Sequence, residues 1–225
     1  MNPETNIANG APDAATKEQA AQIHRLLAPG DSEVRRSFAT LAQNLVALGR
    51  PMRSVVVTGP ERGVGRTTVC LGLGAALAAA GEKVTVVDCN LDRPHLHTCF
   101  GKPNFTGLTS ALESSNALES YGFEAVPNLH VIPTGPILSG SQILVKSPKL
   151  VEAVQALHAE RSNVVLMDAP VASEVLLAPN LWGSFDGVLL VVHATRTPKG
   201  AARGFIDGLL DAQINLFGVV LNGHV

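Results

Sequence analysis

The pattern of polar and apolar positions along the chain changes its period near residue 53. Before this point, one set of apolar residues recurs at helical spacing: Val34, Phe38, Leu41, Leu45 and Leu48. Asp31 and Ser32 precede the set and are of the residue types that cap helices, so the pattern predicts a helix over 31–48. A shorter helix is predicted within 18–27, before a Pro-Gly break.

After residue 53, short apolar runs alternate with longer amphipathic stretches. Six runs predict strands: 54–59, 83–88, 129–134, 163–168, 187–192 and 217–222. Three stretches predict helices: 67–80, 148–160 and 199–213. Continuous valine and leucine runs indicate strands buried on both faces, and intervening helices indicate right-handed parallel units. The sequence therefore predicts one doubly wound α/β domain with a mainly parallel sheet over 31–225. Residues 1–30 are expected to form a disordered arm that contains the short helix.

Composition narrows the class of protein. The chain has 225 residues, 46% hydrophobic and 16% charged, with a net charge of −2, which is typical of one ordered domain. Its lysines and arginines are scattered, which argues against nucleic acid as the main partner. Three cysteines fit a reducing compartment, and the longest apolar run is shorter than the roughly 20 residues of a membrane span. We expect a cytoplasmic protein whose membrane role comes through a partner.

The stretch "VVVTGPERGVGRTT" at 55–68 has the features of a strand, a phosphate-binding loop and a helix start. Glycines allow backbone N–H groups to approach phosphates, and the helix N-terminus adds positive potential. The candidate nucleotide-binding residues of this loop are Gly63, Val64, Gly65, Arg66, Thr67 and Thr68. Arg66 stands where such loops have lysine. Because arginine is longer and planar, we expect phosphoryl transfer or hydrolysis to suffer more than binding.

Two aspartates follow predicted strands, Asp88 after 83–87 and Asp168 after 163–167. Ligands of open α/β sheets bind at this carboxyl edge, so both are candidate catalytic residues. Together with Thr67 they are also the candidate Mg²⁺ ligands. The alternative for either aspartate alone is a cap on the next helix or turn.

These motifs resemble the cytoplasmic domain of bacterial tyrosine kinases of capsule and exopolysaccharide synthesis, which are P-loop ATPases. The resemblance covers about residues 33–223, and its motifs occur in order: "RGVGRTT" at 62–68, "DCNLDRP" at 88–94, "DAPV" at 168–171 and "GVVLNG" at 218–223. It implies ATP or ADP with Mg²⁺ as ligands and places Asn222 near the adenine base. It also implies a membrane polysaccharide co-polymerase as partner and a location at the inner membrane through that partner.

The chain departs from the family pattern at positions that bear on chemistry. The changed positions are Arg66 for lysine, Asn90 for the second motif aspartate, Asp92 for arginine, and Arg36, Ala39 and Ala42 for the ring-forming E-x-x-R-x-x-R. The single tyrosine, Tyr121, excludes a phosphorylated tyrosine cluster within this sequence. We therefore expect a weakened homo-oligomeric ring and impaired catalysis.

Four functions remain open from the sequence. The favoured one is an exopolysaccharide-biosynthesis regulator that binds ATP but is catalytically impaired. The alternative is an active tyrosine kinase or ATPase that phosphorylates a partner in trans. A partition or site-positioning ATPase is disfavoured because Glu61 stands where that branch has a second lysine. The last is a structural role without ligand.

Overall fold

The computed structural model describes residues 21, 23–28, 30, 32–114, 116–160 and 162–223. Residues 1–20 of the predicted arm lie outside this part of the chain. The helix predicted within 18–27 is present over 23–27. Ile23 and Leu26 are buried in the same apolar cluster as Ala42 and Leu45, so packing extends N-terminal to residue 31.

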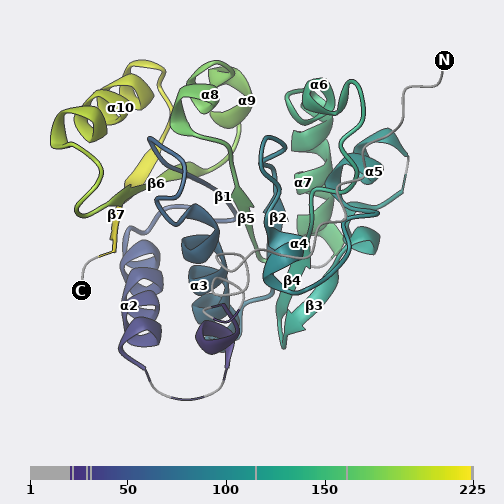
Figure 1. The fold of residues 1–225 in the computed structure, drawn as a ribbon, viewed down its shortest axis with the longest axis horizontal. Helices are drawn as coiled ribbons and strands as arrows, with labels where there is room; N and C mark the ends of the chain where they lie inside the picture. Colours follow the sequence, from purple (N-terminus) through teal and green to yellow (C-terminus); the bar gives the residue numbers. More distant parts are fainter. Residues whose placement is uncertain are drawn as a thin grey trace.

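A seven-stranded sheet forms the centre of the molecule, in the order β3-β4-β2-β5-β1-β6-β7 (Figure 1). The strands are β1 (Ser54–Thr58), β2 (Val84–Asp88), β3 (Phe123–Val126), β4 (Leu129–Ile132), β5 (Val164–Asp168), β6 (Gly187–His193) and β7 (Leu216–Asn222). Every neighbouring pair is parallel except β3 and β4. The predicted α/β class and the six predicted strands are confirmed, and β3 is the strand that the sequence analysis missed.

Helices cover both faces of the sheet. One face carries α2 (Glu33–Ala47), α3 (Arg66–Ala79) and α4 (Leu96–Cys99). The other carries α5 (Leu108–Glu113), η1 (Leu118–Tyr121), α6 (Ser141–Val145), α7 (Pro148–Glu160), α8 (Ala172–Leu176), α9 (Pro179–Trp182) and α10 (Lys199–Asp211). The four long predicted helices are present as α2, α3, α7 and α10. The short ones were not predicted, because four to six residues show no helical period.

The central strands are buried along their full length, as the valine and leucine runs predicted. Every residue of β1, β2 and β5 is buried. Because these strands are parallel, their carboxyl ends meet at one edge of the sheet, which is where the phosphate loop and both strand-end aspartates lie. Within the described residues, none of the helices combines the length and hydrophobicity that a bilayer crossing requires.

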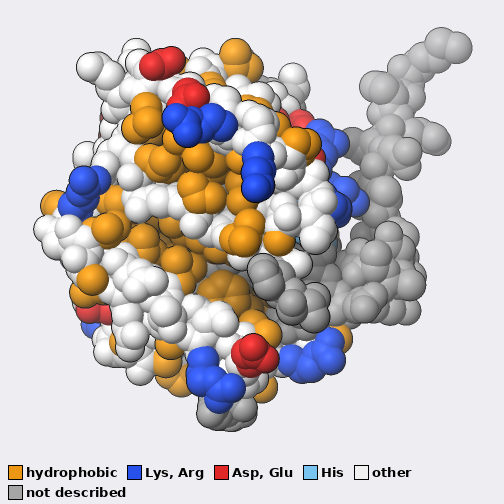
Figure 2. Space-filling view, turned by 90° about the vertical axis from the view of Figure 1, so that its left-hand side faces the viewer, with side chains coloured by type: hydrophobic (Ala, Val, Ile, Leu, Met, Phe, Trp, Pro, Cys, Tyr) orange, Lys and Arg blue, Asp and Glu red, His pale blue; other side chains and the backbone are white. Residues whose placement is uncertain are grey.

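The outer strand β7 leaves apolar side chains exposed. Val219 and Leu221 on β7, and Leu210 on α10, are each about half exposed. Figure 2 faces the left-hand side of Figure 1 and shows hydrophobic side chains gathered in the middle of this surface. The opposite edge of the sheet is formed by β3, which pairs with β4 in the antiparallel direction.

Helix α2 packs closely against α3 at a glycine. A Cβ built on Gly72 of α3 would lie 2.4 Å from the Phe38 ring of α2. Ser32 caps α2 by accepting a hydrogen bond from the Arg35 backbone N–H at 3.3 Å. The absence of a side chain at Gly72 therefore allows α2 to lie this near to the helix that begins at the phosphate loop.

We expect Gly72→Ala to lower the free energy of unfolding by about 1–3 kcal/mol, because the added methyl group overpacks the Phe38 contact. Urea denaturation measures the change. Gly204→Ala on α10 is the matched control, since a Cβ there meets nothing within 4 Å. The control should gain roughly 0.5–1 kcal/mol. Equal stability of the two variants would contradict the proposed close packing.

Candidate nucleotide-binding site

The phosphate loop joins β1 to α3 and has the backbone that its glycines predict. Gly63 and Gly65 have φ of 76° and 95°, in the left-handed region that favours glycine. Gly65 precedes the first residue of α3, and no side chain caps the N–H groups of this helix start. These N–H groups and the helix dipole are therefore available to an anion.

Side chains from other strand ends hold the loop in this shape. The Thr197 hydroxyl donates to the Glu61 carboxylate at 2.8 Å, and the Asn222 amide donates to the Val64 carbonyl at 2.8 Å. The Arg196 guanidinium donates to the Gly63 carbonyl at 2.5 Å. Each of these three hydrogen bonds joins residues more than 130 positions apart in the chain. The loop is therefore positioned by the segments that follow β6 and end β7.

Asn222 lies directly against the loop. A Cβ on Gly65 would come within 2.0 Å of the Asn222 amide nitrogen, so only glycine fits beneath it. The proximity to adenine that the resemblance implies for Asn222 stays a prediction. Sequence reasoning missed Arg196 and Thr197, although their position just after the predicted strand at 187–192 was an available signal.

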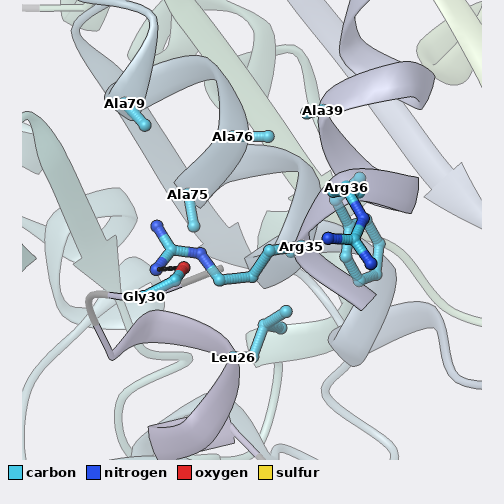
Figure 3. Close-up of a pocket in the computed structure, with 10 residues that line it drawn as sticks. Leu26, Gly30, Arg35, Arg36, Ala39, Ala75, Ala76 and Ala79 are labelled. Carbon is cyan, nitrogen blue, oxygen red and sulfur yellow. Dashed lines mark hydrogen bonds between the residues drawn. The ribbon is translucent and has the colours of Figure 1, made fainter. Parts of the chain in front are cut away.

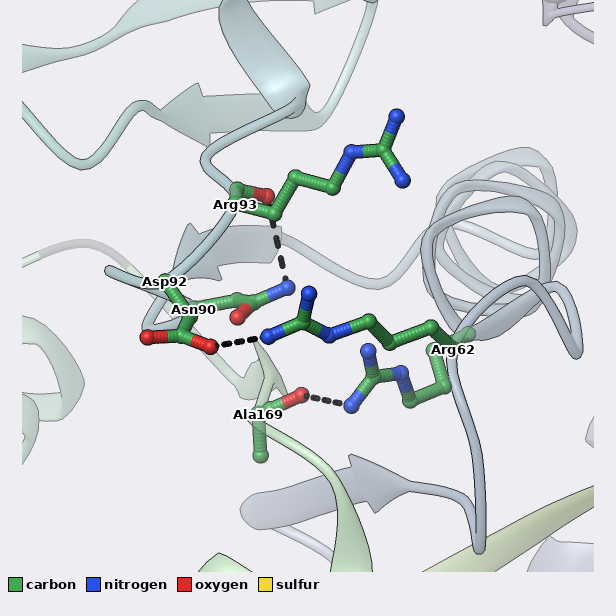
Figure 4. A network of polar contacts seen from close by, with 6 residues as sticks. Arg62, Asn90, Asp92, Arg93 and Ala169 are labelled. Atoms are coloured by element: carbon green, nitrogen blue, oxygen red, sulfur yellow. Dashed lines mark hydrogen bonds and ion pairs between the residues drawn. The ribbon is translucent and has the colours of Figure 1, made fainter.

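Arg66 extends toward the end of β5. Its guanidinium donates to the Ala169 carbonyl at 3.0 Å, and the residue is 8% exposed. Figure 4 labels Ala169, whose carbonyl accepts this bond. Its positive charge also lies near the Asp168 carboxylate and opposes the rise in the pKa of that group. The structure thus places the arginine charge against a strand end of the protein itself.

Asp168 is buried at the carboxyl end of β5, beside Arg66 and Thr67. Its Oδ2 accepts a hydrogen bond from the Thr67 hydroxyl at 2.6 Å. Its Oδ1 is buried and has no hydrogen-bond partner among the described residues. Burial and then the neighbouring Asp88 carboxylate raise the pKa of Asp168 to about 7. Asp168 therefore has a free acceptor oxygen and titrates near neutral pH.

Asp88 lies in register with Asp168 on the neighbouring strand β2 and is fully buried. Its carboxylate accepts backbone hydrogen bonds from Asn90 at 3.1 Å, His95 at 2.9 Å and Leu96 at 3.1 Å. Burial raises the pKa of Asp88, and these three bonds offset part of the rise. The geometry is that of a cap for the turn before α4, which was the alternative left open by the sequence.

The two altered residues of the "DCNLDRP" motif, Asn90 and Asp92, contact different neighbours (Figure 4). The Asn90 amide donates to the Arg93 carbonyl at 3.3 Å. Asp92 forms an ion pair with Arg62 of the phosphate loop, and both side chains are partly exposed. An exposed pair of this kind contributes at most about 1 kcal/mol, so its main effect is to link the two loops.

The residues that could hold a magnesium ion are Thr67 and Asp168. The buried unpartnered Oδ1 of Asp168, next to a hydroxyl, fits a hard cation that prefers oxygen and retains water. Asp88 lies beside them, but its carboxylate already accepts three backbone bonds. The described residues contain no group of three or more His, Cys, Asp or Glu side chains arranged to hold a metal. Any ion at this site therefore relies on phosphate and water oxygens for its remaining ligands.

A separate cavity of about 290 Å³ lies between α2 and α3 (Figure 3). Small side chains of α3 line it, together with Arg35, Arg36 and Ala39 of α2. Two of the three altered ring positions thus border this cavity, whereas Ala42 is buried. The cavity is lined by neither the phosphate loop nor the strand-end aspartates.

The fold and the loop together define the class of the protein as one with a P-loop nucleotide-binding fold. The family model of the cellulose biosynthesis protein BcsQ matches residues 52–198, about two thirds of the chain. The tyrosine-protein kinase YwqD of Bacillus subtilis is 30% identical over 190 residues, covering 83% of this chain and 79% of YwqD. The putative tyrosine-protein kinase EpsB of Ralstonia nicotianae is 33% identical over 169 residues, 75% of this chain. The chain spans only 22% of the length of EpsB.

Solved structures agree with this assignment. The chimerical protein CapA2B2 superposes with a TM-score of 0.77 at 27% identity, covering 85% of each chain. The septum site-determining protein MinD of Pyrococcus horikoshii, solved with Mg-ADP, has the same fold at a TM-score of 0.60 and 24% identity, covering 76% of this chain and 70% of MinD. The chain belongs to the bacterial tyrosine-kinase family of P-loop proteins, to which the BcsQ match also fits.

The buried aspartates predict a pH-dependent stability. Because the pKa of Asp168 is raised to about 7, the folded state binds this proton more tightly than the unfolded state. Its stabilising contribution is full below about pH 4 and is lost as the pH rises through 7. Denaturant titrations at pH 4–8 should show this decline, on the order of 4 kcal/mol at most.

Asp168→Asn should reduce the slope of stability against pH, while part of it remains because burial raises the pKa of Asp88 as well. Asp207→Asn on α10, where the side chain is 54% exposed, is the control and should leave the profile unchanged. A wild-type stability that rises between pH 4 and 7 would refute the assignment.

Proposed function

We propose that the protein is a nucleotide-binding regulator of exopolysaccharide biosynthesis with weakened kinase chemistry. It binds ATP or ADP with Mg²⁺ and works beside a membrane polysaccharide co-polymerase. The support for the pathway is its family, in which YwqD is a tyrosine-protein kinase and the matching model is that of a cellulose biosynthesis protein. The support for the weakened chemistry is the local geometry of Arg66 and Asn90.

The observation that carries the proposal is the hydrogen bond between Arg66 and the Ala169 carbonyl. A loop lysine acts on the transferred phosphoryl group as a compact point charge, and rate depends on where that charge lies in the transition state. The guanidinium of Arg66 is instead held at the end of β5, next to Asp168. Binding through backbone N–H groups survives such a change, because those groups do not depend on the side chain.

The second carboxylate of the motif is also missing. Asn90 is neutral and donates to a backbone carbonyl, and Asp88 is engaged by three backbone N–H groups. Asp168 is thus the strand-end carboxylate with an unpartnered oxygen. Thr67 and Asp168 would hold a magnesium ion here, and the ion would offset the negative charge of the phosphates.

A second candidate, an active kinase or ATPase acting in trans, is favoured by Asp168 itself. A carboxylate whose pKa lies at about 7 is matched to proton abstraction near neutral pH. The Thr67 hydroxyl, the other candidate magnesium ligand, donates to this carboxylate at 2.6 Å. This candidate requires that Arg66 contributes to turnover from its place beside Ala169.

The two candidates make opposite predictions for Arg66→Lys combined with Asn90→Asp. If the chemistry is weakened by these residues, the double variant should hydrolyse ATP or phosphorylate a tyrosine-bearing partner at least tenfold faster than wild type. Calorimetric titration with Mg-ATP and Mg-ADP, run alongside, should show that both proteins bind nucleotide. Radiolabelled phosphate transfer measures the turnover.

Wild-type turnover equal to that of the double variant, and abolished by Arg66→Ala, would instead establish the active enzyme. Arg50→Lys is a suitable control for the substitution itself, because the Arg50 guanidinium donates to the Asn215 side chain at 3.1 Å and Arg50 is not among the site residues.

We also propose that the family ring is weakened. Arg36 and Ala39 are exposed on α2 and replace charges of the ring motif, while Ala42 is buried and uncharged. Light scattering of the purified protein should give a monomer or small oligomer at micromolar concentration. A stable octamer would contradict the expectation.

A further inference from the structure

The turn that follows β6 brings an arginine over the phosphate loop. The Nη2 atom of Arg196 donates to the Gly63 carbonyl at 2.5 Å, and Nη1 lies 3.8 Å from where a Cβ on Gly63 would be. The backbone N–H groups of this loop are those that would cradle phosphates. Arg196 thus stands at the wall of the candidate nucleotide site, in a segment that the family motifs quoted above do not include.

This turn is held in place on both sides. The His193 N–H donates to the Thr197 hydroxyl at 2.9 Å, and the same hydroxyl donates to Glu61 of the loop at 2.8 Å. The Ala194 N–H donates to the Asn222 carbonyl at 2.8 Å, which fixes the turn to the end of β7. Arg196 is therefore carried by a backbone tied both to the loop and to the sheet.

The charge of Arg196 is not neutralised within the described part of the chain. Arg62 pairs with Asp92, and Arg203 pairs with Asp207, whereas Arg196 pairs with no described carboxylate. Its partner is a neutral carbonyl, and the side chain is exposed. A guanidinium in this state, beside a helix start whose N–H groups no side chain caps, is electrostatically suited to a phosphate.

Arg66 does not supply this charge in the same way. Its guanidinium is buried against the Ala169 carbonyl and lies near Asp168, which partly offsets it. Two arginines therefore lie near the loop in which related proteins have one lysine. Arg66 lies near the carboxylate at the end of β5, and Arg196 contacts the loop at Gly63 with an exposed side chain.

We infer that Arg196 is a phosphate-contacting residue that gives this protein its preference for nucleotides with more phosphates. The inference rests on the nucleotide binding proposed above and assigns a further residue to that site. When a nucleotide binds, the guanidinium donates a hydrogen bond to a phosphate oxygen, either in place of its bond to the Gly63 carbonyl or in addition to it. Because the phosphate oxygen carries a negative charge and the carbonyl oxygen does not, the exchange adds an attraction between opposite charges.

Calorimetric titration of the full chain with ATP, ADP and AMP, each with Mg²⁺, tests the inference. Arg196→Gln removes the charge but can still donate a hydrogen bond to the Gly63 carbonyl. We expect it to lose about tenfold in ATP affinity, less in ADP affinity and no more than about twofold in AMP affinity. Arg196→Lys retains the charge and should stay within about threefold of wild type for ATP.

Arg203→Gln on α10 is the matched control, since this arginine is 79% exposed and pairs within its own helix. It should bind all three nucleotides as wild type does. Wild-type ATP affinity in Arg196→Gln would overturn the inference, because a neutral loop anchor would then suffice. An equal loss for ATP, ADP and AMP would also overturn it, by showing a purely structural role.

The outcome for wild type separates this inference from the proposed function. Binding of ATP by wild type, unchanged in Arg196→Gln, rejects Arg196 and leaves the regulator intact. Absence of binding of any of the three nucleotides by wild type rejects the nucleotide-binding function and the role of Arg196 with it.

Discussion

The burial of two carboxylates side by side, at the ends of β2 and β5, is the constraint on which the site depends. Asp88 and Asp168 are in register on neighbouring strands, and both are almost completely inaccessible to water. A buried carboxylate is costly unless hydrogen bonds or opposite charge compensate it. The protein compensates the two carboxylates in different ways, and this difference decides which of them keeps an oxygen available to a ligand.

Asp88 is compensated by backbone. Three N–H groups of the segment that leads into α4 point at its oxygens, so this carboxylate shapes the turn after β2. Asp168 is compensated by the Thr67 hydroxyl and by the nearby charge of Arg66, and one of its oxygens keeps no described partner. The pair therefore consists of an aspartate engaged by three backbone N–H groups and an aspartate that keeps one oxygen available to a ligand.

The departures from the family pattern are mutually consistent in space. Asp92 stands where the resemblance expects arginine, and an arginine, Arg62, faces it from the phosphate loop. Arg66 is accommodated because the Ala169 carbonyl accepts a hydrogen bond from the guanidinium of this long side chain. The altered residues thus retain a well-connected loop, which is consistent with the proposal that the protein keeps the P-loop fold with weakened chemistry.

The sequence by itself determined the class of the fold, because valine and leucine runs of strand length, separated by helical stretches, indicate parallel strands buried on both faces. It also located the loop, both aspartates and Arg66, since local motifs carry them. It missed β3, although Pro127 and Asn128 have the composition of a two-residue turn and Asn128 has a φ of 65°. Only the tertiary structure decided that Asp88 is satisfied by backbone, that Arg66 reaches Ala169 and that Arg196 overlies Gly63. The contacts of Arg66 and Arg196 join segments more than 100 positions apart in the chain, and no local pattern encodes which distant group meets a charged side chain. The bonds of Asp88 are close in sequence, but they form only because the turn that leads into α4 folds back onto the end of β2.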